Sequence, residues 1–147
     1  MLERLINILS GAEDAPDAEG QNAGRVAVAA VLVEAARADD VYLEAERAMI
    51  DSVLAERYGL TAQDAAALRA DGEVAQAEAV DLVRFTRAIK DAVPHEDRVS
   101  VIEAVWRVIL SDDDRHPDES ALMRRIAGLL YVPDREVGLA RQRVAAD

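Results

Sequence analysis

Apolar residues return every three or four positions along most of the chain, which is the spacing of one buried face of an α-helix. The pattern is nearly unbroken from Arg25 to about Ala38, where almost every residue is apolar. A helix of this kind has no polar face, so we expect it at the centre of the core. The pattern predicts seven main helices, at about residues 25–38, 44–58, 61–70, 75–92, 96–110, 117–130 and 134–145.

Residues typical of helix ends separate these segments. Gly59 stands where a left-handed residue commonly ends a helix, and Pro94 stops a later helix. Thr61 is expected to cap the helix that follows it, and Asp71-Gly72 predicts a break between two helices. The helix after that break is expected to bury four apolar side chains, those of Leu82, Val83, Phe85 and Ile89.

The first 24 residues are expected to lie outside the main domain. Met1–Leu9 has the apolar spacing of a short amphipathic helix, and Ser10–Gly24, which is rich in acids and glycine, is predicted to be a linker. The short helix could lie on a membrane surface. Because Arg4 is its only base, packing on its own domain is the favoured alternative. Residues 25–147 then form one helical domain.

An internal repeat emerges when the chain is shifted by 73 residues. Five pairs then coincide: Asp39 with Asp112, Asp40 with Asp113, Glu46 with Glu119, Val53 with Ile126 and Tyr58 with Tyr131. Each copy reads as an apolar helix, an acidic loop and a second helix that ends in tyrosine. The predicted fold is an all-α, single-domain, pseudo-symmetric bundle of about seven to eight helices. Repeat 1 covers about residues 25–70 and repeat 2 about residues 96–145.

Composition narrows the function mainly by exclusion. The chain has 147 residues, 51% of them apolar, which is enough for one domain with a core. Its net charge of −12 argues against binding nucleic acid or anionic lipid, because both need basic residues. Since cysteine is absent, disulfides and thiolate chemistry are excluded. The longest apolar run, Val26–Val33, is too short for a transmembrane helix, and without a signal peptide the expected location is the cytoplasm.

Each acidic loop gathers several carboxylates within eight residues. Carboxylate oxygens are the ligands that Ca²⁺, Mg²⁺ and Mn²⁺ prefer, so a divalent cation is one candidate cofactor, whereas no organic cofactor is expected. The spacing is not that of an EF-hand, because the twelfth position counted from Asp112 is Met123 rather than glutamate. Alternatively, the acids only stabilise helix N-termini and carry solvated charge. The candidate metal ligands are Asp39, Asp40, Glu46, Asp112, Asp113 and Glu119.

No arrangement typical of an enzyme stands out. His95 and His116 are far apart, and neither a glycine-rich phosphate loop nor a nucleophile elbow occurs. We therefore expect a protein without enzymatic activity. A metal-dependent hydrolase built on the acidic loops is the enzymatic alternative.

A basic stripe is the second candidate feature. Arg84, Arg87 and Lys90 recur every three residues on one predicted helix. In an otherwise acidic chain this stripe could bind a protein partner, whose identity the sequence does not indicate, or support self-association. The simpler alternative is an ordinary solvated helix face.

The first acidic motif resembles a known signature. Ala38-Asp39-Asp40 followed by Glu46 is similar to the A-D-G-x-x-x-x-x-E pattern of TerB-like domains, the family of the tellurite resistance protein TerB, with Asp40 in place of glycine. Ser111–Asp113 with Glu119 matches the pattern more loosely. Two longer segments resemble a stand-alone bacterial branch of the family, Glu103–Asp112 and Arg124–Leu130.

This resemblance implies an all-helical, pseudo-symmetric bundle with a cytoplasmic role in tellurite or other stress resistance and no established enzymatic activity. The family's acidic positions fall on Asp39, Glu46, Asp112 and Glu119, where metal binding is proposed. Some TerB-like domains are attached to J-domain co-chaperones, which implies the alternative of a protein-interaction scaffold without a metal site. Tellurite is not the favoured ligand, because it is an anion and the chain carries a charge of −12.

Overall fold

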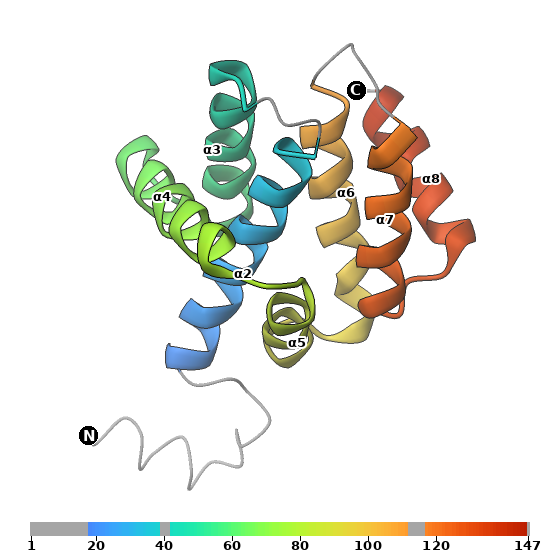
Figure 1. Cartoon of the computed structure of the whole chain (residues 1–147), viewed down its shortest axis with the longest axis horizontal. Helices are drawn as coiled ribbons and strands as arrows, with labels where there is room; N and C mark the ends of the chain where they lie inside the picture. Colours follow the sequence, from blue (N-terminus) through green and yellow to red (C-terminus); the bar gives the residue numbers. More distant parts are fainter. Residues whose placement is uncertain (1–17, 39–41, 112–116, 147) are drawn as a thin grey trace, which may run out of the picture.

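Seven α-helices make up the part of the chain that the computed structural model describes (Figure 1). It describes residues 18–38, 42–111 and 117–146, with side chains in the last range described from residue 121 onward. No strand occurs in these ranges, so the all-α prediction is confirmed. The helices are α2 (Ala18–Ala36), α3 (Glu44–Tyr58), α4 (Ala62–Glu78), α5 (Val83–Ala92), α6 (Arg98–Ile109), α7 (Pro117–Leu129) and α8 (Asp134–Ala146), with a 3-10 turn, η1 (His95–Asp97), before α6.

α2 is the central helix of the bundle. Every side chain from Val28 to Val33 is 0% exposed. α4 and α5 pack against α2 most extensively, and α6 and α3 cover further parts of it. Such a helix is stable only when neighbours enclose it, because its apolar residues surround the axis. The expected central position of this segment is confirmed. No helix in the described ranges has the length and apolar character needed to cross a membrane.

The two predicted repeats are three-helix units joined by α5. In the first unit α4 packs on α2, and in the second α8 packs on α6. α2 and α6 pack against each other between the units. Positions that coincide in the repeat are buried in both copies: Ile50 and Met123, and Val53 and Ile126. The pseudo-symmetric bundle is therefore confirmed.

The two repeats differ where their second helices end. Tyr58 is the last residue of α3, and Gly59 follows it with a left-handed φ of 63°, as expected. α7 ends earlier, at Leu129, and Tyr131 is itself the left-handed residue, with φ 60°. The two tyrosines are therefore not equivalent, and the expectation of a helix ending in tyrosine is wrong for the second copy. A left-handed residue follows the end of both helices. Tyr131 corresponds to Tyr58 in the repeat, so the left-handed residue after α7 comes one position earlier than Gly59 does after α3.

Two stretches predicted as breaks are helical. Residues 18–24, assigned to the linker, form the start of α2, and α4 runs straight through Asp71-Gly72. Each stretch contains a glycine at a contact between helices: a Cβ at Gly24 would meet Ala92, and one at Gly72 would meet Ala29. Glycine has no side chain, so two helix backbones can approach closely at it. Because glycine is also common in turns, a glycine at such a contact looks like a helix break when only the local sequence is considered. The predicted Met1–Leu9 helix and the rest of the linker lie outside the described residues.

The break between α4 and α5 falls later than expected, at residues 79–82. Leu82, Phe85 and Ile89 are buried as predicted, at 4%, 7% and 0% exposure. The prediction that Val83 is buried is wrong, because its side chain is 39% exposed. α5 begins at Val83. The side chains that face inward are that of Leu82, just before the helix, and those of Phe85 and Ile89 within it, so Val83 lies on a different face. The predicted cap is confirmed at Thr61, whose hydroxyl accepts the Asp64 N–H at 3.1 Å.

We expect Gly72→Ala to destabilise the fold. The new Cβ would lie 2.6 Å from the Ala29 Cβ and 2.8 Å from its carbonyl carbon, so α4 would have to move away from α2. This strain should outweigh the ~1 kcal/mol that alanine adds in a helix, and the free energy of unfolding should fall by about 1–3 kcal/mol. The matched control is Gly138→Ala in α8, where no atom lies within 4 Å and stability should rise. Denaturant unfolding measures both; an unchanged or higher stability for Gly72→Ala would contradict the close approach.

Candidate functional site

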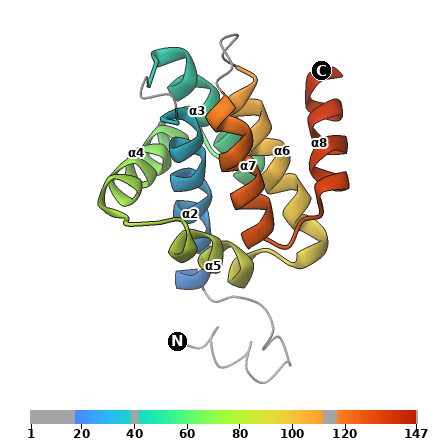
Figure 2. The same ribbon diagram turned by 45° about the vertical axis from the view of Figure 1, so that its right-hand side comes forward.

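The two acidic connections are attached to the same end of the bundle. α2 and α6 finish at this end, and α3 and α7 begin there, as the two ribbon views show (Figure 1 and Figure 2). We call this the acidic end. Residues 39–41 and 112–116, which complete the connections, lie outside the described residues. Four of the candidate metal ligands belong to these segments, Asp39, Asp40, Asp112 and Asp113, and the side chain of Glu119 also lies outside the described part.

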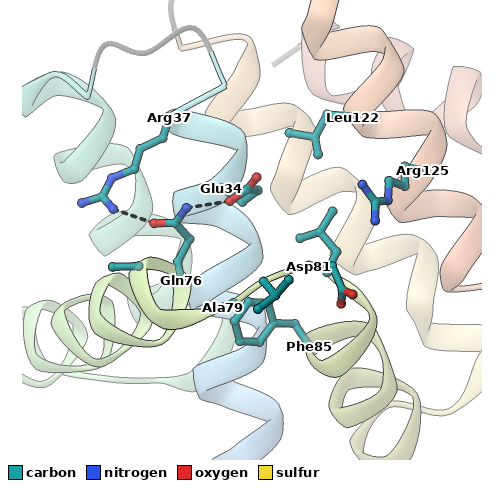
Figure 3. A pocket seen from close by; sticks show the side chains of 11 residues that line it. Glu34, Arg37, Gln76, Ala79, Asp81, Phe85, Leu122 and Arg125 are labelled. Carbon is teal, nitrogen blue, oxygen red and sulfur yellow. Dashed lines mark hydrogen bonds between the residues drawn. The ribbon is translucent and has the colours of Figure 1, made fainter.

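A pocket of about 380 Å³ opens between α2, the α4–α5 connection and α7 (Figure 3). Its lining carries both signs of charge, from Glu34 and Asp81 and from Arg37 and Arg125. The amide nitrogen of Gln76 donates to Glu34 Oε2 at 2.6 Å, and Nη1 of Arg37 donates to the amide oxygen of Gln76. Since Arg37 directly follows α2, the pocket lies beside the acidic end. Three of its polar groups, those of Glu34, Gln76 and Arg37, are therefore bonded to one another.

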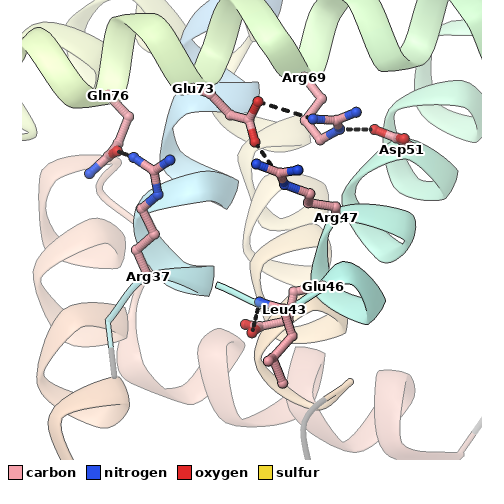
Figure 4. A network of polar contacts seen from close by, with 8 residues as sticks. All are labelled: Arg37, Leu43, Glu46, Arg47, Asp51, Arg69, Glu73 and Gln76. Carbon is pink, nitrogen blue, oxygen red and sulfur yellow. Dashed lines mark hydrogen bonds and ion pairs between the residues drawn. The ribbon is translucent and has the colours of Figure 1, made fainter. Parts of the chain in front are cut away.

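An ionic network next to this pocket ties α3 to α4 (Figure 4). Arg69 pairs with Asp51 at 2.6 Å and with Glu73, one helical turn away, at 3.0 Å. Arg47 approaches the other oxygen of Glu73 at 3.3 Å. Burial lowers the pKa of Arg69, but the hydrogen bond to Asp51 and the two carboxylate charges outweigh it and raise the pKa. The network therefore holds its charges in fixed pairs.

Tyr42 joins this network directly after the first acidic connection. Two guanidinium groups lie over its ring, that of Arg37 at 4.9 Å and that of Arg47 at 5.0 Å from the ring centre. Burial, and after it the neighbouring Glu73 carboxylate, raises the pKa of Tyr42 to about 12. The phenol is therefore neutral at physiological pH. These contacts hold Tyr42 in place directly after the first acidic connection.

The sequence pattern does not indicate this network. Its members come from α3, α4 and the residues between α2 and α3, and Arg37 and Gln76 are 39 residues apart. Local spacing reveals only the pair of Arg69 and Glu73, which are four positions apart on one helix. The other contacts arise from the packing of α4 against α2 and α3.

Glu46 is the one candidate metal ligand whose side chain the structure describes. It is 4% exposed, and its Oε1 accepts the backbone N–H of Leu43 at 3.2 Å (Figure 4). A carboxylate at this position satisfies an N–H group that has no partner within the helix. This contact agrees with the capping alternative for Glu46. A role for Glu46 in metal binding stays a prediction.

The described side chains do not form a metal site among themselves. No group of three or more histidine, aspartate or glutamate side chains within the described ranges is placed to hold an ion. His95 is exposed, with Nε2 3.0 Å from the Tyr131 carbonyl oxygen, whereas His116 lies outside the described residues. A cation site at the acidic end would therefore depend on carboxylates of the two connections. Their residue types suit a hard divalent cation.

The predicted basic stripe is divided in the structure. Arg84 and Arg87 are exposed on the outer face of α5, and no described carboxylate lies within ion-pair distance of either. Lys90 is partly buried, and its ammonium lies 4.6 Å from the ring centre of Tyr131. The first two residues stay candidates for binding a partner, whereas Lys90 already has a contact within the chain.

Comparison with known proteins points to one family. The family model described as tellurite resistance protein TerB matches residues 25–142. Comparisons with curated proteins and with solved structures give no match. The matched range contains both acidic connections and covers most of the chain, so the resemblance to the TerB family is confirmed.

The raised pKa of Tyr42 predicts a loss of stability at high pH. A folded pKa of about 12 lies above the ordinary value of 10.0, so the folded chain holds the phenol proton more tightly than the unfolded chain does. The resulting stabilisation is fully present below pH 10.0 and is lost as the pH rises from there to about 12. In a spectrophotometric titration, we expect one of the three tyrosines to ionise near pH 12.

This step should disappear in Tyr42→Phe and persist in the control Tyr131→Phe. Loss of the step in the control, or its persistence in Tyr42→Phe, would contradict the assignment.

Proposed function

The chain belongs to the tellurite resistance protein TerB family, and on this premise we propose that it is a non-enzymatic module that binds a divalent cation at its acidic end or presents that end as a charged docking face. The family associates the module with tellurite resistance. One observation carries the proposal: the ends of α2, α3, α6 and α7 attach both acidic connections to one end of the bundle.

The physical argument for a cation is electrostatic. Carboxylates that are brought close together repel one another, and a bound divalent cation relieves this repulsion while their oxygens replace its water. Ca²⁺, Mg²⁺ and Mn²⁺ all accept such ligands. The proposed ligands are Asp39, Asp40, Asp112, Asp113 and Glu119, with Glu46 as a further candidate.

We expect a suitable cation to raise the thermal stability of chelator-stripped protein. An ion present at 100 times its Kd should add about 2.7 kcal/mol, which corresponds to several degrees in Tm. Ionic strength is matched with NaCl, because salt alone screens the self-repulsion of a chain with net charge −12. The stabilisation should disappear in the double variant Asp39→Asn with Asp112→Asn.

The control removes the same charge elsewhere, through Asp71→Asn with Asp91→Asn. Both residues are exposed, on α4 and α5, so the cation effect should persist. If stabilisation survives the Asp39 and Asp112 changes, or no ion exceeds NaCl, the acidic end is not a cation site and its acids act as helix caps.

The outer face of α5 favours a second candidate function, that of a protein-interaction scaffold without a metal site. Arg84 and Arg87 are exposed there without a described carboxylate partner. Val83, the first residue of α5, is 39% exposed, and Val80, in the connection before it, is 100% exposed. Paired basic and apolar groups suit a protein segment that carries acidic and apolar side chains.

For this scaffold function, a partner captured by the wild-type chain should be lost after Arg84→Glu with Arg87→Glu. Both side chains are exposed, so the fold should tolerate the change. The control is Arg124→Glu with Arg135→Glu, which reverses two exposed arginines of α7 and α8. Quantitative pull-down compares the three proteins; equal loss in both double variants would show a general charge effect and rule out a specific α5 surface.

A further inference from the structure

A second pocket, of about 360 Å³, lies away from the acidic end. It is formed where α2 begins, α3 ends and α6 begins, and the connection after α5 closes one side. Its basic side chains are Arg25 and Arg57, and Tyr58 and Ser100 lie with them. We call it the arginine pocket.

Two arginines from different helices are held on the same tyrosine. The guanidinium carbon of Arg25 lies 4.7 Å from the ring centre of Tyr58, and that of Arg57 lies 5.6 Å from it. Nε of Arg57 donates to the Tyr58 hydroxyl at 3.3 Å, and Nη1 donates to Ser100 Oγ at 2.9 Å. Ser100 in turn donates to the carbonyl of Asp97. Arg57 is therefore fixed by two bonds, and Arg25 by stacking.

Neither arginine has a carboxylate counter-ion among the described residues. Arg69, Arg107 and Arg143, by contrast, pair with Asp51, Glu56 and Glu103. Two like charges close together repel each other, and a bound anion would relieve this repulsion.

We propose that the arginine pocket binds a small, doubly charged oxyanion of the phosphate type. Each guanidinium offers a planar fork of N–H donors that matches two anion oxygens. A carboxylate has enough lone pairs for two such forks but carries only one negative charge. A tetrahedral oxyanion of the phosphate type accepts from both forks, and its two negative charges balance the two arginines. Nη2 of Arg57 takes no part in its bonds to Tyr58 and Ser100, which use Nε and Nη1.

The net charge of the whole chain affects how strongly the arginine pocket should bind an anion. A net charge of −12 repels anions at long range, and the exposed Asp97 also lines the pocket. We therefore expect weak binding that depends on direct contact with the arginines. This site is independent of the cation proposed for the acidic end, because it uses other residues at another end of the helices.

The test is a titration of ¹⁵N-labelled protein with inorganic phosphate at pH 7.5, with ionic strength held constant by NaCl. Amide shifts should concentrate at the residues that line the pocket, and should saturate. Arg25→Ala should weaken phosphate binding about tenfold or more, because it removes charge-assisted hydrogen bonds. Arg25→Lys should recover only part of the affinity, because it restores charge without the planar fork.

The control variant is Arg124→Ala, which removes one exposed arginine of α7, a helix that contributes nothing to the pocket. Its affinity should equal that of the wild type. Arg57→Ala is the second variant, and its fold is checked by thermal unfolding because Arg57 also joins α3 to Ser100 of α6. Shifts that spread over the surface, match those in NaCl, or persist equally in Arg25→Ala would overturn the proposal.

Discussion

The enclosure of α2 is the constraint on which the rest of the structure depends. From Val28 to Val33 this helix has no exposed side chain, so neighbouring helices must cover it on every side. Covering it requires small contact residues, and Gly24 and Gly72 allow α5 and α4 to approach. Close approach removes apolar surface from water at roughly 25 cal/mol per Å² and avoids the cost of voids. The positions of α4 and α5 follow from this requirement.

Because the enclosed helix surfaces are apolar, the polar groups lie at the helix ends and on the outer faces. Both acidic connections attach at one end, where Tyr42 and the ion pairs of Arg69 lie beside the first of them. Away from it, Arg25 and Arg57 converge on Tyr58. Because the helices run between these two regions, they keep the acidic connections apart from Arg25 and Arg57. This separation keeps the cation site and the anion site that we propose from neutralising each other.

Much of the fold follows from local sequence signals, and the exceptions share one cause. The helix that ends at Gly59 and the cap at Thr61 were predictable, because both depend on neighbours in the chain. Asp71-Gly72 was misread as a break, because its glycine serves a contact with a helix about 40 positions away in sequence. The repeat predicted the arrangement of the two units, but not that Tyr131 takes the left-handed position in the second.

The sequence by itself determined the helical class, the central apolar helix, the internal repeat and the two acidic segments. These properties depend on periodicity and residue type, which are local. Only the tertiary structure decided which charges meet. Arg37 reaches Gln76 across 39 positions and Arg57 reaches Ser100 across 43, and no spacing rule relates such pairs. Their contacts depend on the angles and distances at which whole helices pack, and those are decided by the buried apolar surface rather than by the polar residues themselves.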